Sequence, residues 1–237
     1  MIRRRGLAAS ARQRAGRVIA IAAVALGLPA CAAAQPYIGG TAPHAGSIEI
    51  GGGVIWTAGY DAGSRDATES PNTTTGGSPL TLFTSSSRVR PVTGVGAQAG
   101  VYLSSRVSVE GVFQYSKPSL VTTLGDDFEN AAPLDAVGGL SSYLVGGSLL
   151  YHFGSGKVVP FVAGGASYLR QLDEANADVL TGNDVHAGGG VKVWFGSGES
   201  RVGLRIDAQV SSRSKSAGFE DKRRTLPVVG AGLVFLF

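Results

Sequence analysis

The sequence predicts an all-β protein, specifically an eight-stranded antiparallel up-and-down transmembrane β-barrel with a polar, filled lumen. Eight segments alternate apolar and polar residues with the period of two that sends neighbouring side chains to opposite faces of a strand. Short turns alternate with long polar connections between these segments, a pattern typical of barrels that cross a membrane. The last segment, 225–237, carries no charge and ends on Phe237, whereas the termini of soluble proteins usually fray in water.

Composition and charge exclude several other classes. Glycine contributes 36 of 237 residues and charged residues only 16%, which disfavours a disordered chain. The formal net charge of +4 misleads, because six of the 21 Lys and Arg lie within residues 1–34, which contain no acidic residue. The remaining 15 basic residues face 17 acidic ones, so the rest of the chain has a net charge of about −2. We therefore expect no nucleic-acid partner.

Residues 1–34 have the layout of a secretory signal peptide. A basic start precedes an apolar core at 18–28, and small residues lead to Ala34. That core is too short to cross a bilayer as a helix. The single cysteine, Cys31, is lost with the signal, or it is lipidated if residues 28–31 act as a lipoprotein box. We expect a short periplasmic leader at 35–46 and the barrel at 47–237.

The first four predicted strands follow from alternating residues. Segment 47–60 places Glu49, Gly51, Gly53 and Thr57 opposite an apolar face formed by Ile48, Ile50, Val54, Trp56 and Tyr60. Segment 92–103 alternates apolar residues with positions that are mostly glycine. Segment 106–116 separates valines and aromatics from polar residues that include Glu110. Segment 140–153 has an apolar face of Tyr143, Val145, Leu149, Tyr151 and Phe153.

The last four strands are assigned in the same way. Segment 157–170 alternates least cleanly, and we expect its lipid face to consist of Val159, Phe161, Ala163 and Leu169. Segments 184–195 and 202–211 separate apolar residues from a polar face that holds His186, Lys192, Arg205 and Asp207. Segment 225–237 presents apolar odd positions, with Gly230 and Gly232 between them. Short turns join strands two to three, four to five and six to seven.

The long connections at 61–91, 117–138, 171–182 and 212–222 are expected to be loops at one end of the barrel, with 80–90 extending the second strand as a projecting hairpin. Aromatic belts are expected at both interfaces. One belt contains Tyr102, Tyr151, Phe153, Phe161, Phe195, Phe235 and Phe237, and the other Trp56, Tyr60, Tyr115 and Tyr143. Tyr102 and Trp194 have the parity of lumen residues, which departs from this pattern.

Charged residues share the face opposite the apolar one, so that face is expected to point into the lumen. An eight-stranded barrel is just wide enough for side chains to fill it, and buried charges must be paired. Three acids and two bases are available to form a polar lumen network: Glu49, Glu110, Asp207, Lys192 and Arg205. We expect a plugged interior. The alternative is a soluble sandwich with one solvated face.

Segment 106–115 (RVSVEGVFQY), the glycine-alternating strands and the final GLVFLF resemble the small outer-membrane barrels of the OmpA/OmpX-like family. The resemblance covers about 47–237. It implies insertion in the bacterial outer membrane with both termini periplasmic, and recognition of Phe237 by the barrel-assembly machinery. It also implies carboxylate pairs with guanidinium or ammonium groups, which Glu110, Arg205 and Lys192 are placed to supply. We expect no peptidoglycan-binding domain after the barrel.

The expected role is structural or surface-interactive: membrane integrity, adhesion, or ligand binding through long extracellular loops. Expected partners are outer-membrane lipid and lipopolysaccharide, with Lys222, Arg223 and Arg224 contacting lipid phosphates; the protein is expected to be a monomer. The alternatives are a narrow porin-like channel and, less favoured, a lipid A-modifying enzyme. His186 has no serine two residues away, as a serine–histidine hydrolase of that kind needs, so we expect no enzyme, cofactor or metal.

Overall fold

The computed structural model describes residues 42–69, 80–126, 131–173, 178–196, 200–214 and 222–237. The predicted signal peptide lies outside these residues, as does the leader up to residue 41. The described strands are β1 (Ile48–Thr57), β2 (Tyr60–Glu69), β3 (Leu80–Val89), β4 (Val92–Tyr102), β5 (Val107–Ser116), β6 (Ser119–Gly125), β7 (Leu134–His152), β8 (Val158–Asp173), β9 (Val179–Phe195), β10 (Arg201–Arg213) and β11 (Arg224–Leu236).

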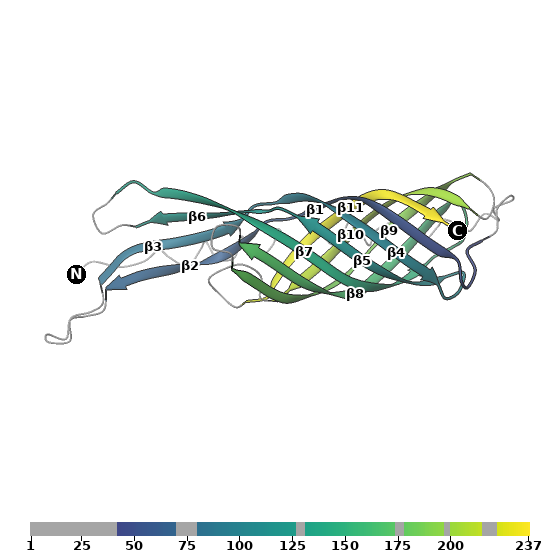
Figure 1. The fold of residues 1–237 in the computed structure, drawn as a ribbon, viewed down its shortest axis with the longest axis horizontal. Coiled ribbons are helices and arrows are strands. Elements are labelled where there is room, and N and C mark those ends of the chain that lie inside the picture. The colour runs from purple at the N-terminus through teal and green to yellow at the C-terminus, as the bar shows by residue number, and fades with distance from the viewer. Residues whose placement is uncertain (1–41, 70–79, 127–130, 174–177, 197–199, 215–221) are drawn as a thin grey trace, which may run out of the picture. The chain divides into compact units, whose positions relative to one another are not determined.

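Eight of these strands form a closed antiparallel barrel in the order β1-β4-β5-β7-β8-β9-β10-β11, with β1 pairing with both β4 and β11 (Figure 1). The pairing of β7 with β8 completes the ring. Reciprocal backbone hydrogen bonds between Ile48 and Phe237, at 3.0 and 2.9 Å, end the seam between the first and last strands. Closure satisfies every strand edge, which a hydrocarbon environment requires. The predicted eight-stranded barrel is therefore confirmed.

A second, four-stranded sheet continues from the barrel at the end opposite Phe237, in the order β2-β3-β6-β7 (Figure 1). β7 belongs to both sheets: residues Leu134–Gly139 pair with β6, and Ser142–Tyr151 pair with β5. The predicted hairpin at 80–90 corresponds to β3. The predictions of loop at 61–69 and for most of 117–138 were wrong. Polar and charged residues interrupt any regular alternation in these segments, but backbone pairing with their neighbours still makes them strands.

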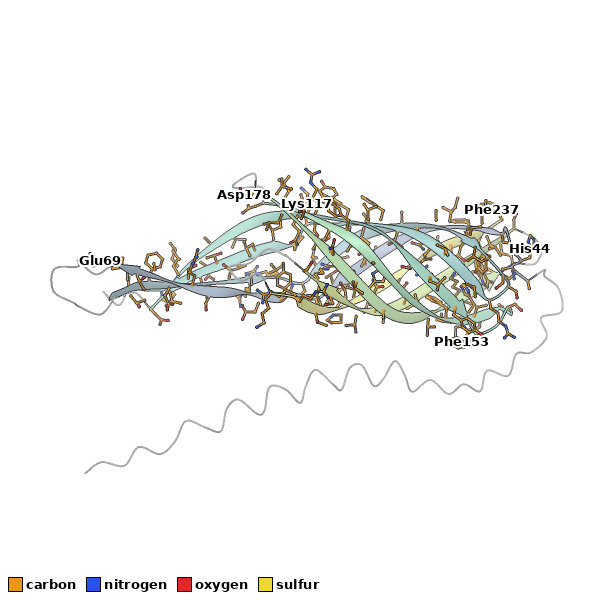
Figure 2. All side chains as sticks on the ribbon, turned by 90° about the horizontal axis from the view of Figure 1, so that it is seen from below. His44, Glu69, Lys117, Phe153, Asp178 and Phe237 are labelled. Carbon is orange, nitrogen blue, oxygen red and sulfur yellow. The ribbon has the colours of Figure 1, made fainter. Side chains whose placement is uncertain are left out.

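The outward face of the barrel is apolar around its circumference. Exposed side chains there include Ile50, Val54, Val95, Val145, Leu149, Val162, Ile206 and Leu233, each 46–55% exposed. Tyr151, Phe153, Phe195, Phe235 and Phe237 form an aromatic belt at the end where Figure 2 labels Phe153 and Phe237. Toward the other end Trp56, Tyr143 and Tyr168 are exposed, and Tyr115 packs on Tyr143 with ring centroids 4.9 Å apart. This is the surface that lipid requires.

The structure corrects the predicted face of β8. Val159, Phe161 and Leu169 are at most 4% exposed and point inward, and Ala163 lines the lumen, whereas Val158, Val162 and Tyr168 face outward. Both faces of this strand carry apolar residues, so alternation alone does not identify the lipid side. Phe161 and Tyr102, each 2% exposed, are therefore not part of the belt. Among the described residues, no helix is long and apolar enough to span a membrane.

Tyr60 was also predicted to face lipid and does not. The chain breaks its strand at 58–59 before β2 begins. Tyr60 instead packs with Leu120 against the buried residues Val89 and Leu140. This small apolar cluster lies where the barrel meets the projecting sheet, and it gives that sheet a packed base.

Candidate functional site in the barrel lumen

One polar cluster lies at the end of the lumen near Phe237 and is centred on Lys192 of β9. The Lys192 ammonium, 1% exposed, donates to both Glu49 carboxylate oxygens of β1 at 2.7 Å. Tyr102 of β4 donates its hydroxyl to the same carboxylate at 3.0 Å. The third Lys192 proton is directed at His152 Nε2, 3.2 Å away, so that nitrogen accepts while Nδ1–H points at the Arg106 carbonyl, 3.3 Å away. Every buried charge in this cluster has a partner.

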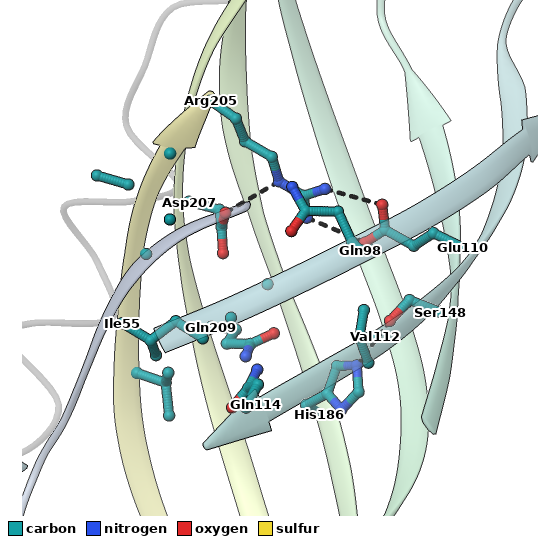
Figure 3. Close-up of a pocket in the computed structure, with 18 of the residues that line it drawn as sticks. Ile55, Gln98, Glu110, Val112, Gln114, Ser148, His186, Arg205, Asp207 and Gln209 are labelled. Carbon is teal, nitrogen blue, oxygen red and sulfur yellow. Dashed lines mark hydrogen bonds and ion pairs between the residues drawn. The ribbon is translucent and has the colours of Figure 1, made fainter. Parts of the chain in front are cut away.

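A second cluster bridges opposite walls of the barrel. Arg205 of β10 makes a bidentate pair with Glu110 of β5, at 2.8 and 3.0 Å, while its Nε donates to Asp207 at 3.0 Å (Figure 3). The guanidinium carbon also lies 4.9 Å from the centroid of the Phe161 ring. Gly232 and Gly230 stand opposite Arg205 and Asp207 on β11, which leaves room for these side chains. Bidentate geometry gives such pairs strength and a fixed orientation.

An apolar cluster beside the Lys192 group narrows the lumen further. Tyr102, Val159, Trp194, Val234 and Leu236 are all buried and in mutual contact. The Arg201 guanidinium carbon lies 5.5 Å from the centroid of the Trp194 ring. Gly203 is needed here, because a Cβ at that position would lie 2.8 Å from the indole. Apolar rings and paired charges thus fill the end of the lumen nearest Phe237.

A third polar chain, which the sequence did not reveal, lies toward the projecting sheet. Ser148 Oγ is 2.8 Å from His186 Nε2, and His186 Nδ1 is 3.1 Å from Asp184 Oδ1. The other Asp184 oxygen accepts from Ser211 and from Arg213 Nε, the latter at 3.1 Å. Ser148, His186 and Asp184 are at most 6% exposed.

The lumen between these groups contains a cavity of about 70 Å³. Its lining includes Glu110, Arg205 and Asp207 as well as Ser148 and His186, with the side-chain amides of Gln98, Gln114 and Gln209 (Figure 3). These donors and acceptors make the cavity polar, and it is large enough to hold ordered water. Within the part of the chain that the structure describes, no group of three or more His, Cys, Asp or Glu is placed to hold a metal.

The five residues predicted for the lumen network occupy two separate clusters. Glu49 and Lys192 pair in one, and Glu110, Arg205 and Asp207 meet in the other. The partners that the sequence did not reveal are Tyr102 of β4 and His152 of β7, which join Glu49 and Lys192 from other strands. His186 has no serine two residues away on its own strand, as stated from the sequence, but Ser148 reaches it inside the lumen from across the neighbouring strand β8. Only the strand register, which places Ser148 and His186 on either side of Gly165, could have indicated this contact.

Comparison with known proteins gives a structural likeness only. No family model matches the sequence, and no curated protein matches it. The crystal structure of the outer membrane protein OprG from Pseudomonas aeruginosa is similar, with a TM-score of 0.50 and 14% identity over 82% of this chain and 97% of that chain.

Two structures of Ail, the attachment invasion locus protein of Yersinia pestis, match less closely, each at 12% identity over 81% of this chain and 99% of that chain. The one in complex with the heparin analogue sucrose octasulfate has a TM-score of 0.46, and the other 0.39. The likeness to OprG, together with the closed eight-stranded barrel, bears out the resemblance to small outer-membrane barrels at the level of the fold. With its eight strands closed around buried polar residues, this chain has the fold of the OmpA/OmpX-like small outer-membrane β-barrels.

Proposed function

We propose that this protein is anchored in the bacterial outer membrane by its barrel and acts in surface interaction through the sheet β2-β3-β6-β7. In this proposal both termini are periplasmic and the projecting sheet faces the medium. The observation that carries it is the continuation of paired strands beyond the apolar belt. Strands that only had to cross a membrane would end near the belt, because about 9–11 residues suffice for a tilted span, whereas β7 has 19.

The distal part of this sheet carries apolar side chains without a lipid contact to explain them. Leu82 and Phe83 of β3 are 39% and 37% exposed, and Leu134 and Val137 of β7 are each 63% exposed. Strand pairing connects the two groups. Thr84, next to Phe83, pairs with Gly125 of β6, and Leu124, next to Gly125, pairs with Leu134 of β7. Leu134 and Val137 lie three residues apart in a regularly paired stretch, so apolar groups are exposed on both faces of the sheet. Exposed apolar surface of this kind is typical of interaction surfaces. We infer that the sheet adheres to apolar partner surfaces.

The filled lumen argues against the channel alternative. Ions would have to pass through space that is already occupied. Ion pairs cross the lumen, and the apolar cluster around Trp194 fills one end of it. We expect purified barrel in planar bilayers to show no steady conductance. Stepwise single-channel currents that persist in repeated preparations would instead favour a narrow porin-like channel.

The surface role is tested with cells of a Gram-negative host that produce the full chain. Adhesion to polystyrene beads is compared for the wild type, a variant carrying Leu82→Ser, Phe83→Ser, Leu134→Ser and Val137→Ser, and a control carrying Thr81→Ser and Ser86→Ala in the same sheet. We expect several-fold weaker adhesion for the first variant only. Equal adhesion of all three, at equal amounts of heat-modifiable folded barrel, contradicts the proposal.

The proposed contact with lipopolysaccharide phosphates has its own support. Lys222 and Arg223 are exposed where β11 begins, and the Arg224 guanidinium carbon lies 5.9 Å from the centroid of the Tyr60 ring. Cations beside the outer interface attract anionic headgroups, and each is worth about 1 kcal/mol near a charged membrane surface. Replacing Lys222 and Arg223 by Ser is expected to weaken binding to lipopolysaccharide vesicles at low salt. Unchanged binding would exclude this contact.

A further inference from the structure

The Ser148–His186–Asp184 chain is held in one line across three adjacent strands. Ser148 of β7 pairs with Gly165 of β8, and Gly165 pairs with His186 of β9. A Cβ at Gly165 would lie 2.7 Å from His186 Nε2 and 2.8 Å from Ser148 Oγ. The glycine therefore leaves the gap through which the imidazole reaches the serine, and any larger residue would block their hydrogen bond.

The hydrogen bonds also fix the direction of proton donation. Asp184 accepts from Ser211 and from Arg213 through Oδ2, and its Oδ1 faces His186 Nδ1. A carboxylate held in this way requires the proton of a neutral imidazole to lie on Nδ1. The unprotonated Nε2 then accepts from the Ser148 hydroxyl, 2.8 Å away. This is the arrangement of a serine nucleophile activated by a histidine that a carboxylate orients.

The serine faces space that a small acyl group can enter. Ser148 and His186 both line the 70 Å³ cavity, together with the amide groups of Gln114 and Gln209 and the guanidinium of Arg205. Gln114 and Gln209 carry amide N–H donors on this lining, whereas the Arg205 guanidinium is already bound by Glu110 and Asp207.

We propose that Ser148 is an activated serine that is acylated by small carboxylic esters entering the lumen. The Oγ atom forms a bond to the ester carbonyl carbon while its proton passes to His186 Nε2. The bond from that carbon to the leaving alkoxide then breaks, and Nε2 returns the proton to give the free alcohol. The products are an acetyl- or similarly acylated Ser148 and one alcohol. This goes beyond the proposed surface role, because it concerns the lumen and needs neither the projecting sheet nor a partner.

The probe is p-nitrophenyl acetate, added to the full barrel folded in detergent. Released p-nitrophenolate is followed by absorbance, and the acetylated residue is located by peptide mass mapping. Ser142→Ala is the matched control, because Ser142 lies on the same strand and the same face as Ser148 and is also 6% exposed. Ser148→Ala removes the nucleophile, and His186→Gln removes the base while retaining a polar side chain. Heat-modifiable gel mobility verifies that each variant is folded.

We expect Ser148 of the wild type and of the Ser142→Ala variant to be acetylated about 10²–10⁴ times faster than in the His186→Gln variant, the range for a positioned general base. Acetylation of Ser148 is expected to be lost when the wild type is unfolded in urea. The proposal is overturned if folded wild type gains no acetyl group at Ser148, or if His186→Gln leaves the rate unchanged. Neither result depends on adhesion by the projecting sheet, so this test and that of the surface role fail independently.

Discussion

Replacing Lys192 by Met is expected to leave the Glu49 carboxylate buried with one donor, the Tyr102 hydroxyl, in place of three hydrogen bonds. Glu49 is only 3% exposed, so water does not readily replace the ammonium. Removing one member of a buried ion pair usually costs about 3–5 kcal/mol. The loss of unfolding free energy should not exceed about 4 kcal/mol, because protonating a glutamate of ordinary pKa at pH 7 costs that much. We therefore expect Lys192→Met to lower the free energy of unfolding by about 3–4 kcal/mol.

The double variant Glu49→Gln, Lys192→Met provides the internal control. It removes both charges and retains two side chains of similar volume, so most of the lost stability should return. Reversible urea unfolding of the barrel in lipid vesicles, followed by tryptophan fluorescence and by gel mobility without boiling, measures both variants. If the double variant is as unstable as Lys192→Met, the cost comes from lost packing, and the reasoning from a stranded charge is refuted.

Three further predictions concern the barrel wall. Val145→Arg, within the apolar belt of β7, is expected to cost about 2–4 kcal/mol in vesicle unfolding, whereas Val137→Arg on the same strand, in the projecting sheet, should cost almost nothing. Gly203→Val should lower the free energy of unfolding by about 1–3 kcal/mol, because its side chain would displace the Trp194 indole. An unchanged urea midpoint would argue against that contact. Deleting Phe237 removes the last hydrogen bonds of the seam between β1 and β11, so the folded fraction in outer-membrane preparations should fall. Deleting Gly6 should change that fraction less, and equal folded fractions for the two deletions would contradict the seam argument.

The sequence was informative wherever one face of a strand differs chemically from the other. Segments 202–211 and 225–237 alternate so regularly that their lipid and lumen faces were assigned correctly, including Arg205 and Asp207 as lumen residues. The prediction for β8 failed because inward-facing Val159 and Phe161 alternate with outward-facing Val158 and Val162, so both faces appear apolar. The predictions for the projecting strands β2 and β6 failed because polar residues are mixed with apolar ones on both of their faces. Periodicity has no contrast to detect in either case.

The sequence alone determined the class of the protein: the period of two, the uncharged terminal strand and the near balance of lumen charges predict a closed barrel with a polar interior. Tertiary structure decided which of these charges meet. Glu49 and Lys192 are separated by 143 positions, and Ser148 reaches His186 only because Gly165 lies between them in the register. Closure of the barrel sets that register, and it depends on hydrogen bonds along every strand at once. A contact across the lumen is therefore a property of the closed sheet, and no single segment of the sequence encodes it.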